Sequence, residues 1–433
     1  MNPPQKKIGL WMCTSLVIGN MIGAGVFLMP AALATFGGIS IFGWLFSAAG
    51  GLLLASIFSR LSKLVGEKNG GPYIYTKEGM GDFAGFLVAW GYWISTWVAN
   101  AAITIAFVSA LSIFFPVLET NALLSVLLGL VTIWVLTWVN ARGLRESGKL
   151  QLITTLLKLI PLGLVIVGGV FFFDIKNFVP FNSSSSTNLG AIAITATMTL
   201  YAFLGIESAT VPASNVENAA KTVPRATMLG TVITTLVYVL STVVVMGMIP
   251  SEALSRSPSP FADAMDIIAG AWGRDVVAAG AAIAAFGALN GWILIQGQIA
   301  MATAKDNLFP SIFKRENKKG VPAMGIVIGS LLTSIIMLMN YTDGLVEQFK
   351  FMILLTTLCC LVPYLFSTAA YILILVQRKS PNHNWLPDLI LSSLAFLFSL
   401  WAIYGAGEEA VFYGFLLLLA GIPFYVWMKF RNH

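Results

Sequence analysis

The chain has 433 residues, of which 57% are hydrophobic and only 10% are charged, and its formal net charge is +6. Soluble globular chains carry charge on roughly a quarter of their residues, so this composition excludes a soluble fold and predicts an integral membrane protein. It also excludes a separate soluble domain, because every polar stretch is short enough to be a loop or a small surface helix.

Twelve long runs almost free of charge follow one another along the chain. A hydrocarbon core about 30 Å thick needs about 20 apolar residues per helix, so each run predicts one transmembrane helix. The predicted spans are 8–34, 39–62, 83–115, 121–141, 148–173, 188–212, 226–249, 275–304, 322–340, 349–376, 387–406 and 409–428. The first run is too long for a removable signal sequence and lacks a small-residue cleavage pattern. The sequence therefore predicts an all-α integral membrane fold.

Lys and Arg side chains divide unevenly between the two sets of loops. Twelve spans place both termini on one side, and the loops and tails on that side hold twenty Lys and Arg residues. The opposite loops hold four, which are Lys176, Arg256, Arg274 and Lys350. Because cytoplasmic loops retain positive charge, we expect both termini to be cytoplasmic. The basic charge then reflects topology and contact with anionic membrane lipids, and it does not indicate nucleic-acid binding.

Two predicted spans contain helix-breaking residues near their middle. The first carries Gly19 to Gly25 followed by Pro30, and the sixth carries Leu204 to Ser208 followed by Pro212. Taken alone, two glycines four residues apart are better explained by close helix packing. Paired breaks at matching places instead indicate a transporter site, because unwound backbone at membrane depth is tolerated where it lines a cavity.

The matching breaks divide the single domain, residues 1–433, into two halves. Spans one to five, within 1–173, correspond to spans six to ten, within 188–376. The remaining region, 387–428, supplies two additional helices. We therefore expect two structural repeats of five helices each.

Lys158 and Glu207 are the only ionisable residues well inside the predicted spans. Each costs at least a few kcal/mol there unless it is paired or hydrated, so both are functional candidates. Glu207 either contacts a cationic substrate, takes part in proton movement and gating, or ties helices together. Lys158 either carries a coupling proton or holds the fifth span against the first. His383 and His433 lie in a loop and a tail, so neither a His relay nor a metal site is expected.

Four aromatic residues stand close to the expected cavity, namely Tyr92, Trp93, Tyr201 and Trp292. An aromatic face binds an ammonium or guanidinium group, or forms a thin gate, although packing alone explains any one of them better. The sequence contains no phosphate-binding loop and no nucleophile elbow. We therefore expect neither an enzyme nor a bound cofactor.

Four motifs together resemble a known family: the run from Gly19 to Phe27, the turn Gly70-Gly71-Pro72-Tyr73, the break around Glu207, and Gly291-Trp292. In order and spacing the chain is similar to the amino acid–polyamine–organocation superfamily. Within it, the chain looks most like the basic amino acid/polyamine antiporters, especially bacterial arginine/agmatine antiporters. The resemblance implies a 5+5 inverted repeat of the LeuT type with broken helices 1 and 6 and two extra helices. It also implies alternating access, a bacterial inner-membrane location and a homodimer.

The resemblance also implies a set of site residues. The implied substrate-binding residues are Asn20, Ala24, Gly25, Asn100, Leu204, Trp292 and Thr356. The implied gates are Tyr92, Tyr201 and Glu207, with Lys158 and Glu207 as candidates for proton coupling.

Three positions depart from the arginine/agmatine exchangers, which have Trp in place of Tyr201, Ser in place of Ala24, and no lysine at Lys158. Proton-coupled and neutral amino acid carriers of the superfamily do have that lysine. The first hypothesis is an antiporter that exchanges a basic amino acid for an amine or polyamine. The alternative is a proton-coupled symporter or permease for neutral or polar amino acids that uses Lys158. The partners are accordingly a small-molecule amino acid or amine, protons in the second case, and membrane lipids.

Overall fold

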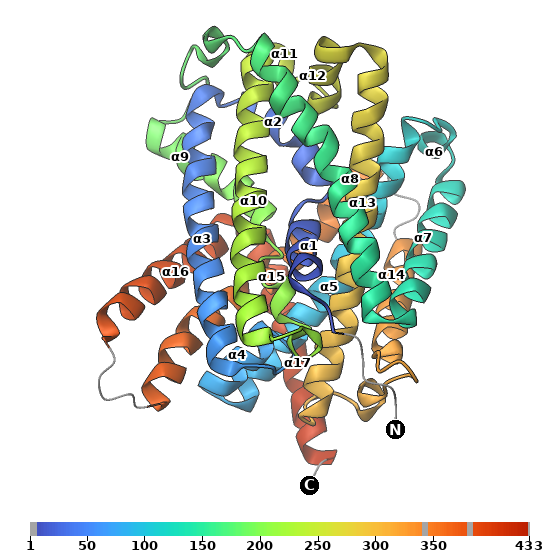
Figure 1. The fold of residues 1–433 in the computed structure, drawn as a ribbon, viewed down its shortest axis with the longest axis vertical. Coiled ribbons are helices and arrows are strands. Elements are labelled where there is room, and N and C mark those ends of the chain that lie inside the picture. Colours follow the sequence, from blue (N-terminus) through green and yellow to red (C-terminus); the bar gives the residue numbers. More distant parts are fainter. Residues whose placement is uncertain (1–6, 340–344, 379–383, 432–433) are drawn as a thin grey trace.

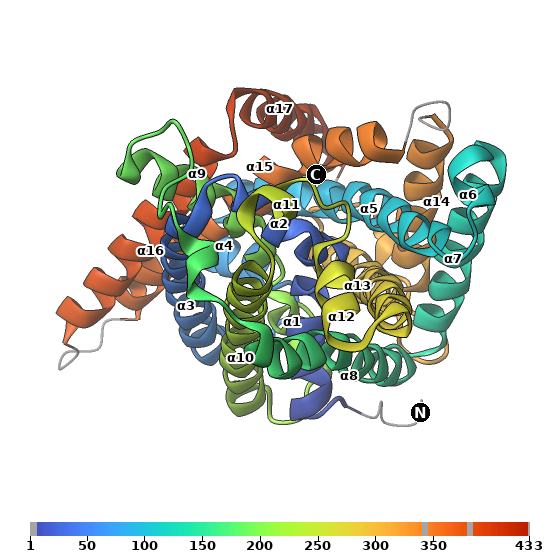
Figure 2. The same ribbon diagram turned by 90° about the horizontal axis from the view of Figure 1, so that it is seen from above.

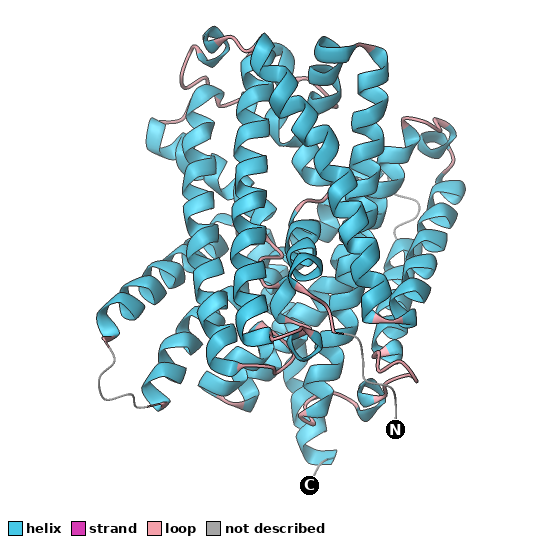
Figure 3. Cartoon of the chain, in the orientation of Figure 1, coloured by secondary structure: helices cyan, strands magenta, loops and turns pink. Residues whose placement is uncertain are grey.

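The computed structural model describes residues 7–339, 345–378 and 384–431, without the side chains of Ala24 and of residues 345–356. In these ranges the chain is helical, and the one β contact is an isolated bridge between Ile8 and Val216 (Figure 3). In chain order the α-helices are α1 (Leu10–Met21), α2 (Met29–Ala34), α3 (Ser40–Val65), α4 (Pro72–Met80), α5 (Asp82–Ser112), α6 (Val117–Thr120), α7 (Ala122–Arg142), α8 (Leu144–Gly169), α9 (Asn188–Leu200), α10 (Ala219–Met248), α11 (Ser251–Ser255), α12 (Pro260–Ala269), α13 (Ala271–Lys305), α14 (Ala323–Met339), α15 (Leu345–Gln377), α16 (Trp385–Gly405) and α17 (Glu408–Arg431).

Ten helical segments are long and apolar enough to cross a membrane, and the bent pair of α1 and α2 makes eleven. The ninth predicted span coincides with α14, which has only 17 residues before the described chain stops at Met339. At 1.5 Å per residue this helix is about 26 Å long, slightly less than the hydrocarbon thickness. The prediction of a helical membrane protein is confirmed. The structure supports ten or eleven spans, so the twelfth span remains a prediction.

Helix α1 lies near the centre of the bundle (Figures 1 and 2), where it packs against α8, α10 and α13. Around it, α3 packs beside α10, and α5 packs against both α13 and α15. Helix α16 packs on α3 and α15, while α17 packs on α5 and α15. The end of α1 therefore lies inside the protein, enclosed by helices from both halves of the chain.

Both ends of the described chain lie on one face of the molecule, which we call the terminal face. Lys7 pairs with Glu67 beyond the end of α3 at 3.4 Å, and Lys429 near the end of α17 pairs with Asp82 at the start of α5 at 2.7 Å. The opposite face, here called the distal face, carries α11 and α12 (Figure 1).

Both predicted breaks are present, but they differ in form. In the first, α1 ends at Met21 and the chain direction changes by 47° before it continues through a 3₁₀ turn into α2. In the second, α9 ends at Leu200 and short 3₁₀ turns follow as far as Asn215, with no second α-helical half. Gly205 in this break has a φ of 108°, which glycine adopts without the steric cost that a side chain brings.

Gly205 also brings the two breaks together. A Cβ atom at this position would lie 3.2 Å from the backbone carbon of Asn20. The absence of a side chain therefore allows the second break to pass directly against the end of α1. Two chain segments almost two hundred residues apart thus meet at the centre of the bundle.

Candidate functional site

A cavity of 410 Å³ lies at the first break. It is bounded by the end of α1, by α2, and by parts of α5, α9, α10, α13 and α15. Among the predicted site residues its walls include Asn20, Gly25, Tyr201, Leu204 and Trp292. No Asp, Glu, Lys or Arg of the described chain lines it. The cavity has the size of a small-molecule site, and a few polar groups in an apolar wall are typical of such sites.

The cavity continues toward the distal face. A second cavity of 240 Å³ shares Gly25, Leu28 and Ala106 with the first. It reaches Ile113, just beyond the end of α5, and Ser259, just before α12. The two cavities together form a path from the centre of the bundle toward the face opposite the chain ends.

Lys158 is fully buried on α8 and binds the end of α1. Its Nζ donates to the carbonyl oxygens of Gly19 at 2.8 Å and Ile22 at 2.6 Å, and it lies 3.5 Å from that of Ala284 on α13. A helix that ends inside the protein leaves carbonyls without intrahelical partners, and the partial negative charge of its C-terminus attracts a cation. No carboxylate in the described ranges lies within ion-pair distance of Lys158, so backbone carbonyls alone hold this side chain.

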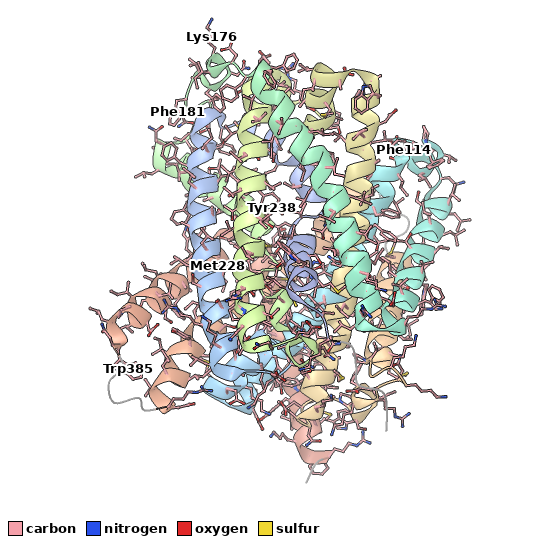
Figure 4. All side chains as sticks on the ribbon, in the orientation of Figure 1. Phe114, Lys176, Phe181, Met228, Tyr238 and Trp385 are labelled. Atoms are coloured by element: carbon pink, nitrogen blue, oxygen red, sulfur yellow. The ribbon has the colours of Figure 1, made fainter. Side chains whose placement is uncertain are left out.

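Two aromatic side chains bind the carbonyls that lie between those two. Trp292 Nε1 on α13 is 3.4 Å from the carbonyl oxygen of Asn20, and Tyr238 Oη on α10 donates to that of Met21 at 2.7 Å. Figure 4 shows Tyr238 on the stretch of α10 beside α1. Both rings also line the cavity. The broken end of α1 is therefore fixed by three different helices, and the same contacts shape the cavity wall.

Asn20 lines the cavity, and its side chain carries a buried hydrogen-bond acceptor without a partner in the described chain. Its Nδ2 donates to Ser208 Oγ in the second break at 2.9 Å, while its Oδ1 has no protein partner in the described chain. A Cβ on Gly291 would lie 1.9 Å from that Oδ1. Glycine on α13 therefore makes room for the amide, and the unpaired oxygen is suited to an ammonium or guanidinium group.

Glu207 is 1% exposed and receives two tyrosine hydroxyl groups. Tyr92 Oη from α5 donates to Oε1, and Tyr364 Oη from α15 donates to Oε2 at 2.5 Å. Tyr364 Oη also accepts the backbone N–H of Gly205 at 3.1 Å, which ties α15 to the second break. The Tyr92 ring lies edge-on to Trp292 with centroids 6.3 Å apart. The predicted gates Tyr92 and Glu207 are thus in direct contact.

The remaining predicted residues are placed as follows. Tyr201 is 37% exposed and lines the cavity where α9 ends. Asn100 is buried on α5 away from the cavity wall, and its Nδ2 donates to Gln296 on α13 at 2.9 Å. The side chains of Ala24 and Thr356 lie outside the described part of the structure.

Tyr238 and Tyr364 were not among the site residues predicted from the sequence, although each contacts one of the breaks. Both lie in apolar runs where an aromatic residue is ordinary, and neither has a neighbouring motif. The one local signal is Pro363, which precedes Tyr364 inside α15. Their roles follow from contacts between distant helices, which no local pattern reports.

A group of polar and charged side chains joins several helices at the terminal face. Asp306, just beyond the end of α13, accepts from Tyr73 Oη at 2.6 Å and pairs with Lys77 at 2.8 Å. Asp82 pairs with Lys429 at 2.7 Å and lies 3.8 Å from Lys77. Burial and the neighbouring Asp306 carboxylate raise the pKa of Tyr73, so its hydroxyl stays protonated and donates. We call these five residues the terminal cluster; it joins α4, α5, α13 and α17.

Comparison with known proteins now identifies the family. The family model described as amino acid permease matches residues 8–425. The chain belongs to the amino acid permease family. It is 34% identical to a cadaverine/lysine antiporter of Escherichia coli (strain K12) over 97% of this chain and 94% of the relative. It is 32% identical to an arginine/ornithine antiporter of Pseudomonas aeruginosa, over 96% and 90% of the two chains. It is 30% identical to a putrescine transporter of Haemophilus influenzae, over 100% and 99%.

Family membership gives the cavity its candidate role. A permease needs a compartment for its solute near the middle of the bundle, and irregular backbone at that depth marks such compartments. In this permease, the cavity at the end of α1 meets both conditions. It is therefore the candidate substrate site.

Proposed function

We propose that this permease is a secondary antiporter that exchanges a basic amino acid for an amine or polyamine by alternating access. The observation that carries the proposal is the near full-length similarity to carriers named for lysine, arginine, ornithine, cadaverine and putrescine. The cavity at the first break supplies a compartment of suitable size between the two breaks.

The substrate binds between the first break and the aromatic wall. Asn20 Oδ1 accepts a hydrogen bond from the ammonium group, and the backbone around Gly25 and Ala24 receives the carboxylate when an amino acid is bound. Because the cavity wall carries no acidic side chain, Trp292 and Tyr201 stabilise the cationic end through their π faces. Leu204 and Thr356 complete the wall in this proposal, with Asn100 behind it.

Gating follows from the contacts between Tyr92, Glu207 and Tyr364. These three side chains link α5, the second break and α15 directly beside the cavity. Movement of α5, of α15 or of the second break would therefore break at least one of the two hydrogen bonds to Glu207. Release toward the terminal face then requires separation of α4 and α5 from α13, where the terminal cluster now joins them.

Counterflow in proteoliposomes tests exchange. Vesicles loaded with unlabelled lysine or arginine should accelerate the uptake of labelled cadaverine, putrescine or agmatine, whereas empty vesicles should show slow uptake. Neutral amino acids inside the vesicles serve as the matched control, because they share the amino and carboxylate groups without the side-chain cation. Uptake that is equal in loaded and empty vesicles and follows a pH gradient would reject exchange.

Lys158 favours a second candidate, proton-coupled uptake of neutral or polar amino acids. Its ammonium group is fully buried, bonded only to carbonyls in the described chain, and placed between the first break and α13. Loss of its proton would release the end of α1 and so couple protonation to the shape of the cavity. Uptake of alanine or serine driven by an inward proton gradient, without any internal substrate, would select this mechanism.

The finer topology belongs to the same proposal. We infer twelve spans, with an inverted repeat relating 1–173 to 188–376 and two additional helices in 387–428. Both termini face the cytoplasm of a bacterial inner membrane, because twenty Lys and Arg residues lie in the loops and tails of that side and four in the opposite loops. Reporter fusions after the Lys176 loop and the Lys319 loop should give opposite signals. Crosslinking in native membranes tests the proposed homodimer.

A further inference from the structure

The last part of the second break is bound by two segments from the first half of the chain. Residues 210–217, which we call the clasped segment, run from the turns after Glu207 to the residues before α10. They lie near the terminal face, where Figure 1 shows α4 and the lower end of α10. We propose that four hydrogen bonds to the backbone of this segment, here called the clasp, hold the terminal side of the permease closed. The clasp must then open before substrate leaves toward that face, as the alternating access of the proposed antiporter requires.

The start of the chain supplies two of the four bonds. The Ile8 N–H donates to the carbonyl oxygen of Asn215 at 2.9 Å, and the Glu217 N–H donates to the Ile8 carbonyl oxygen at 3.0 Å. These bonds form the isolated parallel bridge, in which the side chains of Ile8 and Val216 are fully buried. Helix α1 begins two residues later, at Leu10. Movement of the start of α1 away from the second break would therefore break both bonds.

The turn between α3 and α4 supplies the other two bonds. The Gly70 N–H donates to the carbonyl oxygen of Val211 at 2.9 Å. Asn69 Oδ1 accepts the backbone N–H of Ser214 at 2.7 Å. The clasped segment is thus held from two directions, by the chain start and by this turn.

Glycine allows the turn to approach so closely. Gly70 and Gly71 have φ angles of 114° and 50°, a region that glycine adopts at the least steric cost. A Cβ atom on Gly71 would lie 2.5 Å from Thr210 Oγ1 and 3.1 Å from Val211 Cγ2. The two glycines of the motif Gly70-Gly71-Pro72-Tyr73 therefore place the α3–α4 turn directly against the clasped segment.

The clasped segment contains an alternative partner for the carbonyl that Gly70 binds. In an α-helix the Val211 carbonyl would accept the N–H of Asn215, four residues further on. Here that N–H donates to the Pro212 carbonyl at 2.9 Å, as in a 3₁₀ turn, and Gly70 takes its place. Proline suits the first turn of a helix, because its missing N–H needs no partner there. When the α3–α4 turn withdraws, residues 211–215 can therefore close a helical turn, and the Val211 carbonyl keeps a partner.

The clasped segment is also joined to Glu207. The Thr210 N–H and Oγ1 both donate to the Glu207 carbonyl oxygen, at 2.8 Å and 2.6 Å. The Glu207 carboxylate in turn accepts from Tyr92 on α5 and Tyr364 on α15. Opening of the clasp is thereby linked to the gate contacts through a single short stretch of backbone.

Asn69 gives a test that does not need transport. Asn69→Ala removes one bond of the clasp, so the population open to the terminal side should rise roughly 2- to 12-fold, the effect of one such hydrogen bond. A membrane-impermeant maleimide added on that side should label Cys360 in the cavity faster by the same factor. Serine replaces the other two cysteines, Cys13 and Cys359. Asn69→Asp is the matched control, because it keeps an acceptor oxygen for the Ser214 N–H and should keep the slow rate.

A disulfide across the bridge tests whether the clasp opens during transport. Neighbouring strands lie about 4.8 Å apart, which suits a disulfide, so the double variant Ile8→Cys, Val216→Cys should crosslink on oxidation. Counterflow should then fall in proportion to the crosslinked fraction and return on reduction. Binding of labelled lysine to the purified protein should persist. The unchanged protein and each single variant receive the same oxidant, which controls for the native cysteines.

Two outcomes would overturn the proposal. Equal labelling of Cys360 in the Asn69→Ala and Asn69→Asp proteins shows that the clasp does not hold the terminal side closed. Full exchange by the crosslinked protein shows that the clasp stays intact during transport. An unchanged protein that does not exchange at all rejects the proposed antiporter instead, and the labelling rates then still decide whether the clasp closes this side.

Discussion

The fit between Gly291 and Asn20 gives the sharpest test of the substrate site. In Gly291→Ala, the new Cβ would lie 1.9 Å from Asn20 Oδ1 and 2.9 Å from its Cγ, so the amide must move. Overpacking of this kind costs typically 1–3 kcal/mol. The displaced amide loses its bond to Ser208, and its Oδ1 leaves the position in which we propose that it accepts the ammonium group of the substrate.

The effect on binding follows from the lost hydrogen bond. One such bond contributes roughly 0.5–1.5 kcal/mol, so substrate affinity should fall roughly 2- to 12-fold. Equilibrium binding of labelled lysine or cadaverine to the purified protein measures the change. Gly163→Ala on α8 is the matched control, because a Cβ there meets nothing within 4 Å.

A double-mutant cycle separates the two residues. In an Asn20→Ala background, Gly291→Ala should cause little further loss, since the amide that it displaces is already gone. Equal affinities of the Gly291→Ala and Gly163→Ala proteins would refute the idea that Asn20 binds substrate. Full additivity in the cycle would show that Gly291 acts through another contact.

Three further predictions concern the neighbouring groups. Lys158→Ala leaves two carbonyls of the broken α1 unpaired, so coupled transport should be lost. Uptake into liposomes at several pH values measures this effect. An unchanged pH dependence of uptake would argue against a coupling role for Lys158. Trp292→Ala should lower the affinity for cationic substrates roughly 2- to 30-fold and the affinity for neutral amino acids less, as measured by competition binding. An equal loss of affinity for both classes would mean that the ring only packs. Asp306→Asn removes the ion pair with Lys77, so the terminal face should open more readily. A membrane-impermeant maleimide added on that side should then label Cys360 in the cavity about two- to fivefold faster. The labelling rate is measured in a protein in which serine replaces Cys13 and Cys359, the other two cysteines. A rate that does not change would show that the terminal cluster does not close that side.

Much of the fold follows from local sequence properties. The apolar runs correspond to the helices because each run must satisfy its own backbone hydrogen bonds in hydrocarbon, which a helix does within one segment. The positions of both breaks were likewise predictable, since glycine lowers the cost of leaving the helical conformation. The span count was less certain because α14 is short and the residues that follow it lie outside the described chain.

The form of the second break was not predictable. The run around Glu207 resembles the one after Gly19 in composition, yet the structure continues there as 3₁₀ turns and not as a second helix. Tyr364 binds both Glu207 and the Gly205 N–H, and these contacts replace helical ones. Local propensity cannot report a partner that arrives from a distant helix.

The sequence by itself determined that this protein lives in a membrane, where its helices break, and that Lys158 and Glu207 need partners. The tertiary structure alone decided what those partners are. The carbonyls at the end of α1 are bound by Lys158, Tyr238 and Trp292, which lie 136, 217 and 272 residues from the carbonyls that they bind. A broken helix creates unpaired carbonyls locally, but the donors that satisfy them belong to whichever helices pack around it, and packing is a property of the whole chain.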